Sequence, residues 1–364
     1  MTFYNCKLLL INTCGFENNS FDLTKKHSES KMVKEKSGSK GKLIAAIVIA
    51  VIAGAIIAYF GILPTNNDNN DNSSTSSLTG GWMDVHGVGV FLSGSDDSLY
   101  LATHNGLFKK VQNSDWKRVG DDRSDLMGFT ISLAKDNTMY SSGHPPGMGG
   151  NLGFRKSMDG GNTWQLISNV KDAPVDFHAM TASAANENLI YGSPGGGFEL
   201  YYTLDEGASW KQLTPPDRII ALAADPLDAN TVFAGTISGL FVSNDQGKSW
   251  NKLDHEQIRD TVVTGIGFSA DGKTIYAFKV LQHGEGFIVK SADGGKTWNN
   301  TQGQIPDAKG VWNFAPGRDG KIYAITSQQT SSGVAASIYG SSDDGASWTL
   351  EGTNNEFLAK SNAP

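Results

Sequence analysis

Cysteine is nearly absent from this 364-residue chain. The only two, Cys6 and Cys14, lie close to the N-terminus, and every later position is free of cysteine. Disulfide bonds therefore cannot hold the remaining sequence together. A lipoprotein is anchored through a cysteine that follows its export signal, so the lack of cysteine beyond residue 14 also excludes a lipoprotein anchor after any later export signal.

Acidic residues outnumber basic ones outside the first 42 residues. The formal net charge is −7, whereas residues 1–42 contain eight lysines and four acidic residues, which leaves −11 for the rest. A domain this acidic, with no basic stripe, is not expected to bind nucleic acid. The metal-binding spacings H-x-H and H-E-x-x-H are missing as well.

One long apolar run interrupts the polar sequence. Residues 43–63 carry no charged or strongly polar side chain, and about 20 such residues span a bilayer as a helix. Lysines crowd the preceding segment, and the next basic residue is Lys109. The positive-inside rule then predicts a single-pass membrane anchor with a cytoplasmic N-terminus and an exported remainder. A cleaved signal peptide is the alternative, but the run exceeds the roughly 7–15 residues of its apolar region.

The segments around this span have simple expected roles. Residues 1–42 form a cytoplasmic basic tail, although 1–31 could equally reflect a mis-assigned start, with Met32 as the true one. Residues 64–80 are polar and of low complexity, so we expect a flexible linker. A repeat domain at 81–352 and a C-terminal tail at 353–364 complete the predicted organisation.

An eight-residue pattern, Ser/Thr-x-Asp-x-Gly-x-Ser/Thr-Trp, occurs five times in the repeat domain. The copies occupy residues 157–164, 203–210, 243–250, 291–298 and 341–348. Each copy suits a hairpin turn, in which Asp and Ser/Thr bond turn backbone and glycine supplies a positive φ. The tryptophan is expected to pack between neighbouring units. We therefore assign structural roles to Asp159, Trp164, Asp205, Trp210, Asp245, Trp250, Asp293, Trp298, Asp343 and Trp348.

The spacing of these copies predicts a β-propeller. A period of 40–50 residues with four short β-like runs per unit is typical of a propeller blade. A degenerate copy at residues 113–116 places Trp116 48 residues before Trp164 and adds a sixth unit. The prediction is an all-β, six-bladed propeller after one transmembrane helix. It closes by packing of the first blade on the last or, alternatively, by residues 80–84 completing the last sheet.

The repeat resembles the Asp-box, or BNR repeat, of sialidases, sortilins and related β-propellers. Segments 85–90, 100–108, 125–130, 142–145 and 176–179 also resemble a bacterial family of exported Asp-box propellers labelled glycosyl hydrolases. The resemblance to sialidases implies that function resides on the face opposite the box turns. Sialidase activity itself is not predicted, because the Arg-Ile-Pro signature is missing and no tyrosine lies near a glutamate at the strand start equivalent to that of the sialidase tyrosine.

Four histidines fall on that opposite face. By the strand assignment, His86 and His178 begin inner strands, whereas His104 and His144 end second strands, all within three consecutive blades. Two roles remain open for this ligand-binding face. The imidazoles could bind a transition metal, the only cofactor considered, with Asp125 or Asp176 as partner, or they could transfer protons. Alternatively, they only hydrogen-bond loop backbone.

Two functions follow as hypotheses. In the first, the chain is an envelope-associated binding or assembly module, comparable to Asp-box factors of photosystem II assembly or to sortilin ectodomains; its partner is an envelope protein, a small ligand or a metal. In the second, it is a non-sialidase glycosyl hydrolase acting on glycans, with Asp125, Asp176 and Glu199 as candidate catalytic residues. Facing carboxylates in an open pocket would favour hydrolysis, and converging imidazoles would favour binding.

Overall fold

The computed structural model describes residues 85–353, except 92–97, 112–113, 148, 283, 307, 309, 319 and 331–332. The predicted tail, membrane span and linker at 1–80 lie outside this part, as does the C-terminal tail beyond residue 353. Among the described residues, no helix has the length and apolar character needed to cross a membrane.

Six antiparallel sheets of four strands each make up the described chain, in sequence order. The first sheet consists of β1 (Val85–Gly89), β2 (Leu99–Thr103), β3 (Gly106–Lys110) and β4 (Lys117–Val119). The second consists of β5 (Asp125–Ile131), β6 (Met139–His144), β7 (Phe154–Ser157) and β8 (Gln165–Ser168). The third consists of β9 (Phe177–Ala182), β10 (Ile190–Pro194), β11 (Leu200–Thr203) and β12 (Lys211–Leu213). The fourth sheet consists of β13 (Ile219–Ala224), β14 (Val232–Thr236), β15 (Leu240–Ser243) and β16 (Asn251–Lys252). The fifth consists of β17 (Val262–Phe268), β18 (Ile275–Val280), β19 (Gly286–Ser291) and β20 (Asn299–Asn300). The sixth consists of β21 (Val311–Pro316), β22 (Ile322–Thr330), β23 (Gly333–Ser341) and β24 (Thr349–Thr353).

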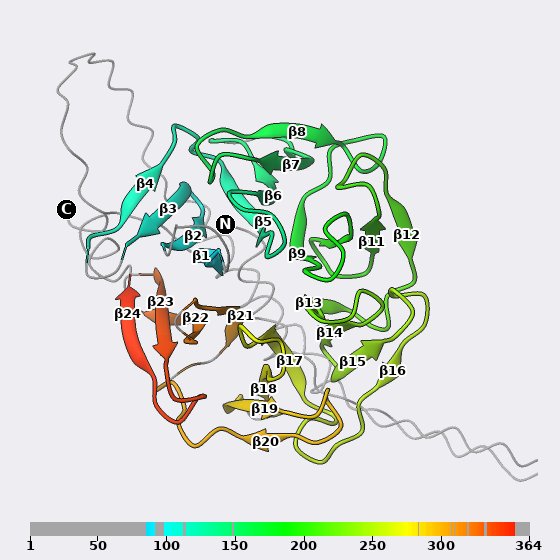
Figure 1. Cartoon of the computed structure of the whole chain (residues 1–364), viewed down its shortest axis with the longest axis vertical. Helices are drawn as coiled ribbons and strands as arrows, with labels where there is room; N and C mark the ends of the chain where they lie inside the picture. Colours follow the sequence, from blue (N-terminus) through cyan, green and yellow to red (C-terminus); the bar gives the residue numbers. More distant parts are fainter. Residues whose placement is uncertain are drawn as a thin grey trace, which may run out of the picture. The chain divides into compact units, whose positions relative to one another are not determined.

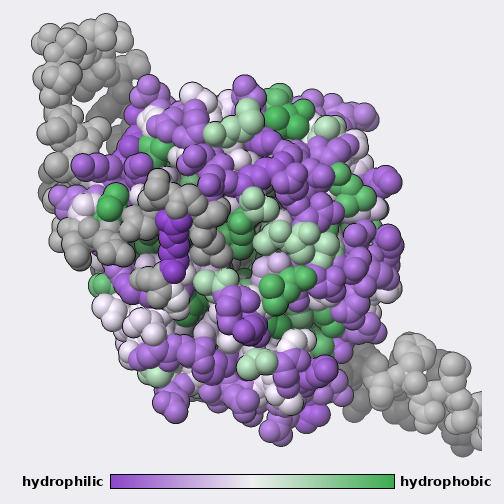
Figure 2. All heavy atoms as spheres, viewed as in Figure 1, coloured by the Kyte–Doolittle hydropathy of each residue, from purple (hydrophilic) through white to green (hydrophobic). Residues whose placement is uncertain are grey.

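The sheets surround a common centre, to which β1, β5, β9, β13, β17 and β21 are nearest (Figure 1). This arrangement is a six-bladed β-propeller, and the prediction of an all-β propeller is confirmed. Figure 2 shows one face, where hydrophilic side chains dominate and hydrophobic ones lie in small separate groups. Scattered apolar side chains of this kind are ordinary on a soluble surface.

The repeated turns join the third and fourth strands of blades two to six. In blade four, the Ser243 hydroxyl oxygen accepts a hydrogen bond from the Gly247 amide at 2.7 Å. The Asp245 carboxylate accepts hydrogen bonds from the backbone amide and the hydroxyl of Ser249, at 2.9 and 2.6 Å. The other four copies bond in the same way. Gly247 has φ of 82°, as expected, and Gln246 before it is also positive at 62°. Each box therefore ties its own hairpin.

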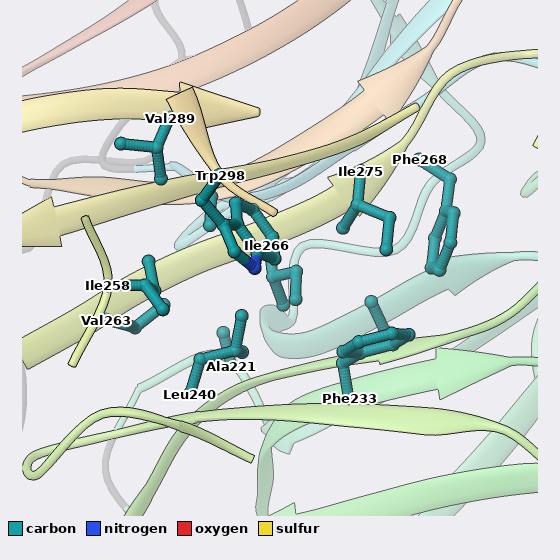
Figure 3. Packing of buried hydrophobic residues seen from close by; sticks show 12 residues of the cluster. Ala221, Phe233, Leu240, Ile258, Val263, Ile266, Phe268, Ile275, Val289 and Trp298 are labelled. Atoms are coloured by element: carbon teal, nitrogen blue, oxygen red, sulfur yellow. The ribbon is translucent and has the colours of Figure 1, made fainter. Parts of the chain in front are cut away.

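The box tryptophans pack between blades but differ in burial. Trp298 is fully buried in a cluster with Leu240 and Ile266, formed by blades four and five (Figure 3). The other four box tryptophans are only half-buried, each against the cluster that joins its own blade to the preceding one. Of the five box tryptophans, only Trp298 is therefore deeply buried.

The ring closes between the first and last blades. Trp116 packs against a cluster that contains Leu101 of blade one and Ile338 of blade six. It thus occupies the position of a box tryptophan, although its box is degenerate. Lys110 also donates to the Glu351 carbonyl at 3.0 Å across the same boundary. Packing therefore joins the two blades, while the alternative closure by residues 80–84 falls outside the described residues.

Candidate functional site

The four histidines of interest lie at the strand ends where the sequence placed them. His86 is the second residue of β1 and His178 the second of β9, while His104 follows β2 and His144 ends β6. Antiparallel pairing brings the start of each inner strand beside the end of its neighbour, which places all four on the face opposite the box turns. The structure brings them into two clusters, each around one aspartate.

The first triplet consists of His86, His104 and Asp125. Asp125 begins β5, so it reaches across from blade two to the two histidines of blade one. His104 Nδ1 lies 2.6 Å from Asp125 Oδ2, and His86 Nε2 lies 3.3 Å from Asp125 Oδ1. Each imidazole therefore faces its own carboxylate oxygen. The two rings meet edge to face, with centroids 4.4 Å apart.

The second triplet consists of His144, Asp176 and His178. Asp176 directly precedes β9, and because residues two apart on a strand share a side, it lies beside His178. His178 Nε2 is 2.6 Å from Asp176 Oδ2, and His144 Nε2 from blade two is 3.2 Å from the same oxygen. The other ring nitrogen of His144 contacts the Gly150 carbonyl at 3.1 Å. Both imidazoles thus converge on a single oxygen.

The two triplets adjoin each other. Asp125 and His144 are directly paired residues of the β5–β6 ladder. His86 and His178 also line a shared cavity of about 30 Å³, together with Trp312 and Asn313 of blade six. A cavity of this size accommodates about one water molecule. The face therefore presents one continuous group of four imidazoles and two carboxylates.

Burial and hydrogen bonding set the charge of the first triplet. Burial would raise the pKa of Asp125, but hydrogen bonds with His104 and His86 outweigh it and hold that pKa far below its usual range. Burial, assisted by the neighbouring His104, lowers the pKa of His86 to about 4, against the opposing effect of Asp125. At neutral pH Asp125 is therefore ionised and His86 is neutral.

In the second triplet, one imidazole is protonated at neutral pH. The hydrogen bond with Asp176 raises the pKa of His144 to about 9, against the effect of burial and with help from the Gly150 carbonyl. Burial would raise the pKa of Asp176, but hydrogen bonds with His144 and His178 lower it overall. At neutral pH, without a bound cation, this triplet pairs a carboxylate with a protonated His144.

Each triplet has the ligand atoms for a metal ion. Within each one, the contributing imidazole nitrogens and carboxylate oxygen all lie within 4.8 Å of one another. Imidazole and carboxylate together suit transition metals such as zinc, copper, nickel or iron. Whether the face binds a metal or transfers protons stays a prediction at this point.

Among the described residues, no contact joins Glu199 to either triplet. It pairs with Lys171 and accepts the Tyr201 hydroxyl at 3.1 Å. The Lys171 ammonium lowers the pKa of Glu199, assisted by Tyr201. Its position beside a lysine on a loop edge does not match that of a carboxylate facing Asp125 or Asp176.

The loop between β10 and β11 contributes features that sequence reasoning did not assign. A Cβ atom on Gly195 would lie 2.9 Å from His178 Nε2, so the imidazole packs directly on that glycine. Phe198 is 70% exposed, and the Arg218 guanidinium lies 5.2 Å from its ring centre. The glycine run at 195–197 was the available signal. The sequence carried no signal for Trp312 and Asn313, since blade six has no histidine at the start of its inner strand.

A larger cavity adjoins the small one beside His86 and His178, since Phe129 and Asn313 line both. It has a volume of about 300 Å³ and is lined by the last parts of the inner strands, including Val90, Ile131 and Phe268. These residues lie at the strand ends that lead to the box-turn face. Its only titratable lining residue among those described is Asp271. The cavity therefore offers space without paired acid, base or metal-ligand groups.

Comparison with known proteins shows the fold. No protein-family model matches the chain, and no curated protein sequence does. A GH74 xyloglucanase from Xanthomonas campestris matches with a TM-score of 0.54 and 16% identity, covering 76% of this chain and 46% of the enzyme. A Niastella koreensis GH74 enzyme matches with a TM-score of 0.54 and 17% identity, covering 75% and 45%. The structure of YCF48 bound to D1 peptide matches with a TM-score of 0.44 and 16% identity, covering 80% of this chain and 88% of YCF48.

The chain spans less than half the length of the GH74 enzymes that it matches. At 16–17% identity this likeness establishes a shared propeller fold and no shared chemistry. The TM-score to YCF48 is too low to support any inference.

Proposed function

We propose that this chain is an exported, membrane-anchored propeller that binds a ligand through the face carrying the two triplets. The observation that carries the proposal is the engagement of both carboxylates: Asp125 and Asp176 are each held between two imidazoles. Imidazoles that converge on buried carboxylates are typical of a binding site for a metal, a polar small molecule or a partner side chain.

The electrostatics argue against a glycosidase. Glycoside hydrolysis generally needs one carboxylic acid that stays protonated near neutral pH beside a second, ionised carboxylate. Hydrogen bonds and ion pairs instead hold the pKa values of Asp125, Asp176 and Glu199 below their ordinary range. None of the three candidates is therefore poised to donate a proton to a leaving sugar oxygen.

A glycosyl hydrolase that acts on surface or extracellular glycans remains the second candidate. The fold likeness to a GH74 xyloglucanase favours it. Propellers of one architecture serve unrelated functions, however, so this likeness weighs less than the state of the carboxylates. The exposed Phe198 beside Arg218 would suit contact with a sugar ring in either function.

The proposed location rests on the sequence alone. The apolar run at 43–63 with lysines before it supports an anchor, and the polar segment at 64–80 would hold the propeller away from the bilayer. Protease treatment of intact spheroplasts should digest the propeller and spare a tag at the N-terminus. Digestion of the tag with protection of the propeller would contradict this orientation.

A turnover screen tests binding against hydrolysis. The full chain in mild detergent would be incubated with xyloglucan, other polysaccharides and chromogenic glycosides, in parallel with Asp125→Asn and Asp176→Asn. We expect no turnover above the protein-free blank for any of the three proteins. Turnover by the unsubstituted chain that either substitution abolishes would overturn the proposed binding role.

A further inference from the structure

The second triplet differs from the first in how its atoms converge. In the first, two imidazoles face two different oxygens of Asp125. In the second, Nε2 of His144 and Nε2 of His178 both approach Oδ2 of Asp176, at 3.2 and 2.6 Å. Three potential ligand atoms from two blades therefore surround one point.

We propose that His144, Asp176 and His178 bind one divalent transition-metal ion. This inference rests on the proposed function, because it names the ligand class of the same face. The ion would replace the hydrogen bonds that hold the three side chains together, with Nε2 of each histidine and the carboxylate of Asp176 as its protein ligands.

The orientation of His144 supports this assignment. A carbonyl oxygen only accepts hydrogen bonds, so the contact between His144 Nδ1 and the Gly150 carbonyl requires a proton on Nδ1. In the neutral ring Nε2 then carries the lone pair, which faces the Asp176 carboxylate 3.2 Å away. Without a metal, a proton on Nε2 bridges these two atoms, and a metal ion would take the place of that proton. Metal-binding histidines commonly show this arrangement, with the remote ring nitrogen bonded to a backbone carbonyl.

The carboxylate gives a second, independent observation. Oδ1 of Asp176 is buried and accepts no hydrogen bond from any residue that the structure describes. A buried acceptor without a donor is costly, since it has lost its water without replacement. A metal ion bound by both oxygens of this carboxylate would supply the missing interaction.

The donor set selects the class of ion. Two imidazole nitrogens and one carboxylate suit zinc, copper, nickel or ferrous iron, whereas magnesium and calcium prefer oxygen ligands. Three protein ligands leave at least one coordination position open. The His144 side chain is 32% exposed, and Cβ atoms on neighbouring Gly147, Gly149 and Gly150 would meet nothing within 4 Å. The open position would therefore be reached from the solvent side, where a donor group of a partner or small ligand could bind.

Calorimetric titration with zinc tests the site. The protein is the full chain in detergent with Cys6→Ser and Cys14→Ser, so that thiols outside the propeller do not compete. We expect one zinc ion to bind, with no competition from magnesium or calcium. Losing a residue that merely orients a metal ligand weakens binding about 10–100-fold, so His178→Ala and Asp176→Ala, which remove ligands, should each weaken it by at least about 100-fold.

His255→Ala is the matched control, because it removes a histidine that lies between β16 and β17, outside both triplets. Its zinc affinity should equal that of the parent. His144→Gln replaces the most exposed of the three ligands and is therefore the ligand variant least prone to misfold. Near-ultraviolet circular dichroism checks that every variant is folded. No zinc binding by the folded parent would overturn the proposal, as would equal losses in His255→Ala and His178→Ala. Failure of the broader binding role would be seen separately, as carboxylate-dependent turnover of a glycan.

Discussion

His178 places Nε2 2.6 Å from Oδ2 of Asp176, two residues before it in the chain. The pair is local, because alternate residues at the start of β9 lie on one side of the strand. His144 joins it from blade two across the blade boundary. A local pair completed by a side chain from the preceding blade gives a site that depends on blade packing.

Zinc should stabilise the folded chain if it binds only the assembled site. At a free concentration 100 times its dissociation constant, a ligand specific to the folded state adds about 2.7 kcal/mol to the free energy of unfolding. Urea unfolding with and without zinc measures this difference. The same comparison in His178→Ala should show no gain, and an equal gain there would place the stabilising zinc elsewhere.

Gly195→Ala should weaken zinc binding without unfolding the propeller. The added Cβ would lie 2.9 Å from His178 Nε2, so the imidazole must move away from its ligand position. Because this change displaces a ligand without removing it, we expect about a 10–100-fold loss of affinity. Gly320→Ala, in blade six, is the control: its Cβ meets nothing within 4 Å and its φ of 78° strains only the local backbone, so the affinity should stay intact. Equal losses in both variants would contradict the steric explanation.

Trp298→Ala should be the most damaging of the box tryptophan substitutions. Its ring is fully buried between blades four and five, so removal should cost about 3–5 kcal/mol of unfolding free energy. Trp250→Ala is the matched comparison, because that ring is only half-buried in the equivalent position. Denaturant titration of both variants gives the two costs. Equal costs would show that burial of the indole does not set its contribution.

The boxes should make stability depend on pH in the acid range. Hydrogen bonds from Ser249, then Ser243, lower the pKa of Asp245 to about 2, and the pKa of Asp293 and of Asp343 is lowered to about 2 in the same manner. In the unfolded chain an aspartate has a pKa of about 3.9. Their stabilisation is therefore fully present above about pH 4 and is lost as the pH falls through about 2.

Asp245→Asn tests this linkage. The variant should be less stable than the parent at pH 7, and the difference in unfolding free energy should shrink as the pH falls from about 4 to about 2. Urea titrations at several pH values measure it. A difference that stays constant with pH would mean that the ionised form of Asp245 has no preferential role in the turn.

Much of the fold could be predicted, because each unit repeats the same short-range chemistry. The Asp245 turn and its four equivalents bond within eight residues, so the pattern shows directly in the sequence. The burial of Trp298 against its half-buried equivalents could not be predicted. It depends on which side chains of the neighbouring blade meet the indole, and those contacts join residues far apart in the chain.

The candidate site was predictable as a face but not as two triplets. Strand order places His86, His104, His144 and His178 at matching strand ends, which the sequence shows. The partition between Asp125 and Asp176 depends on how blades one, two and three pack against each other. Glu199 looked equivalent to these carboxylates by residue type, yet its ion pair with Lys171 depends on loop conformation that no local pattern encodes.

Zinc K-edge X-ray absorption of the zinc-loaded, cysteine-free full chain tests the central claim most directly, because it counts the atoms around the ion. The account predicts two imidazole nitrogens and the oxygens of one carboxylate at about 2.0–2.2 Å, with the remaining coordination by water. A shell without imidazole would contradict a site on the histidine face. More than two imidazoles would contradict the assignment to His144, Asp176 and His178 alone.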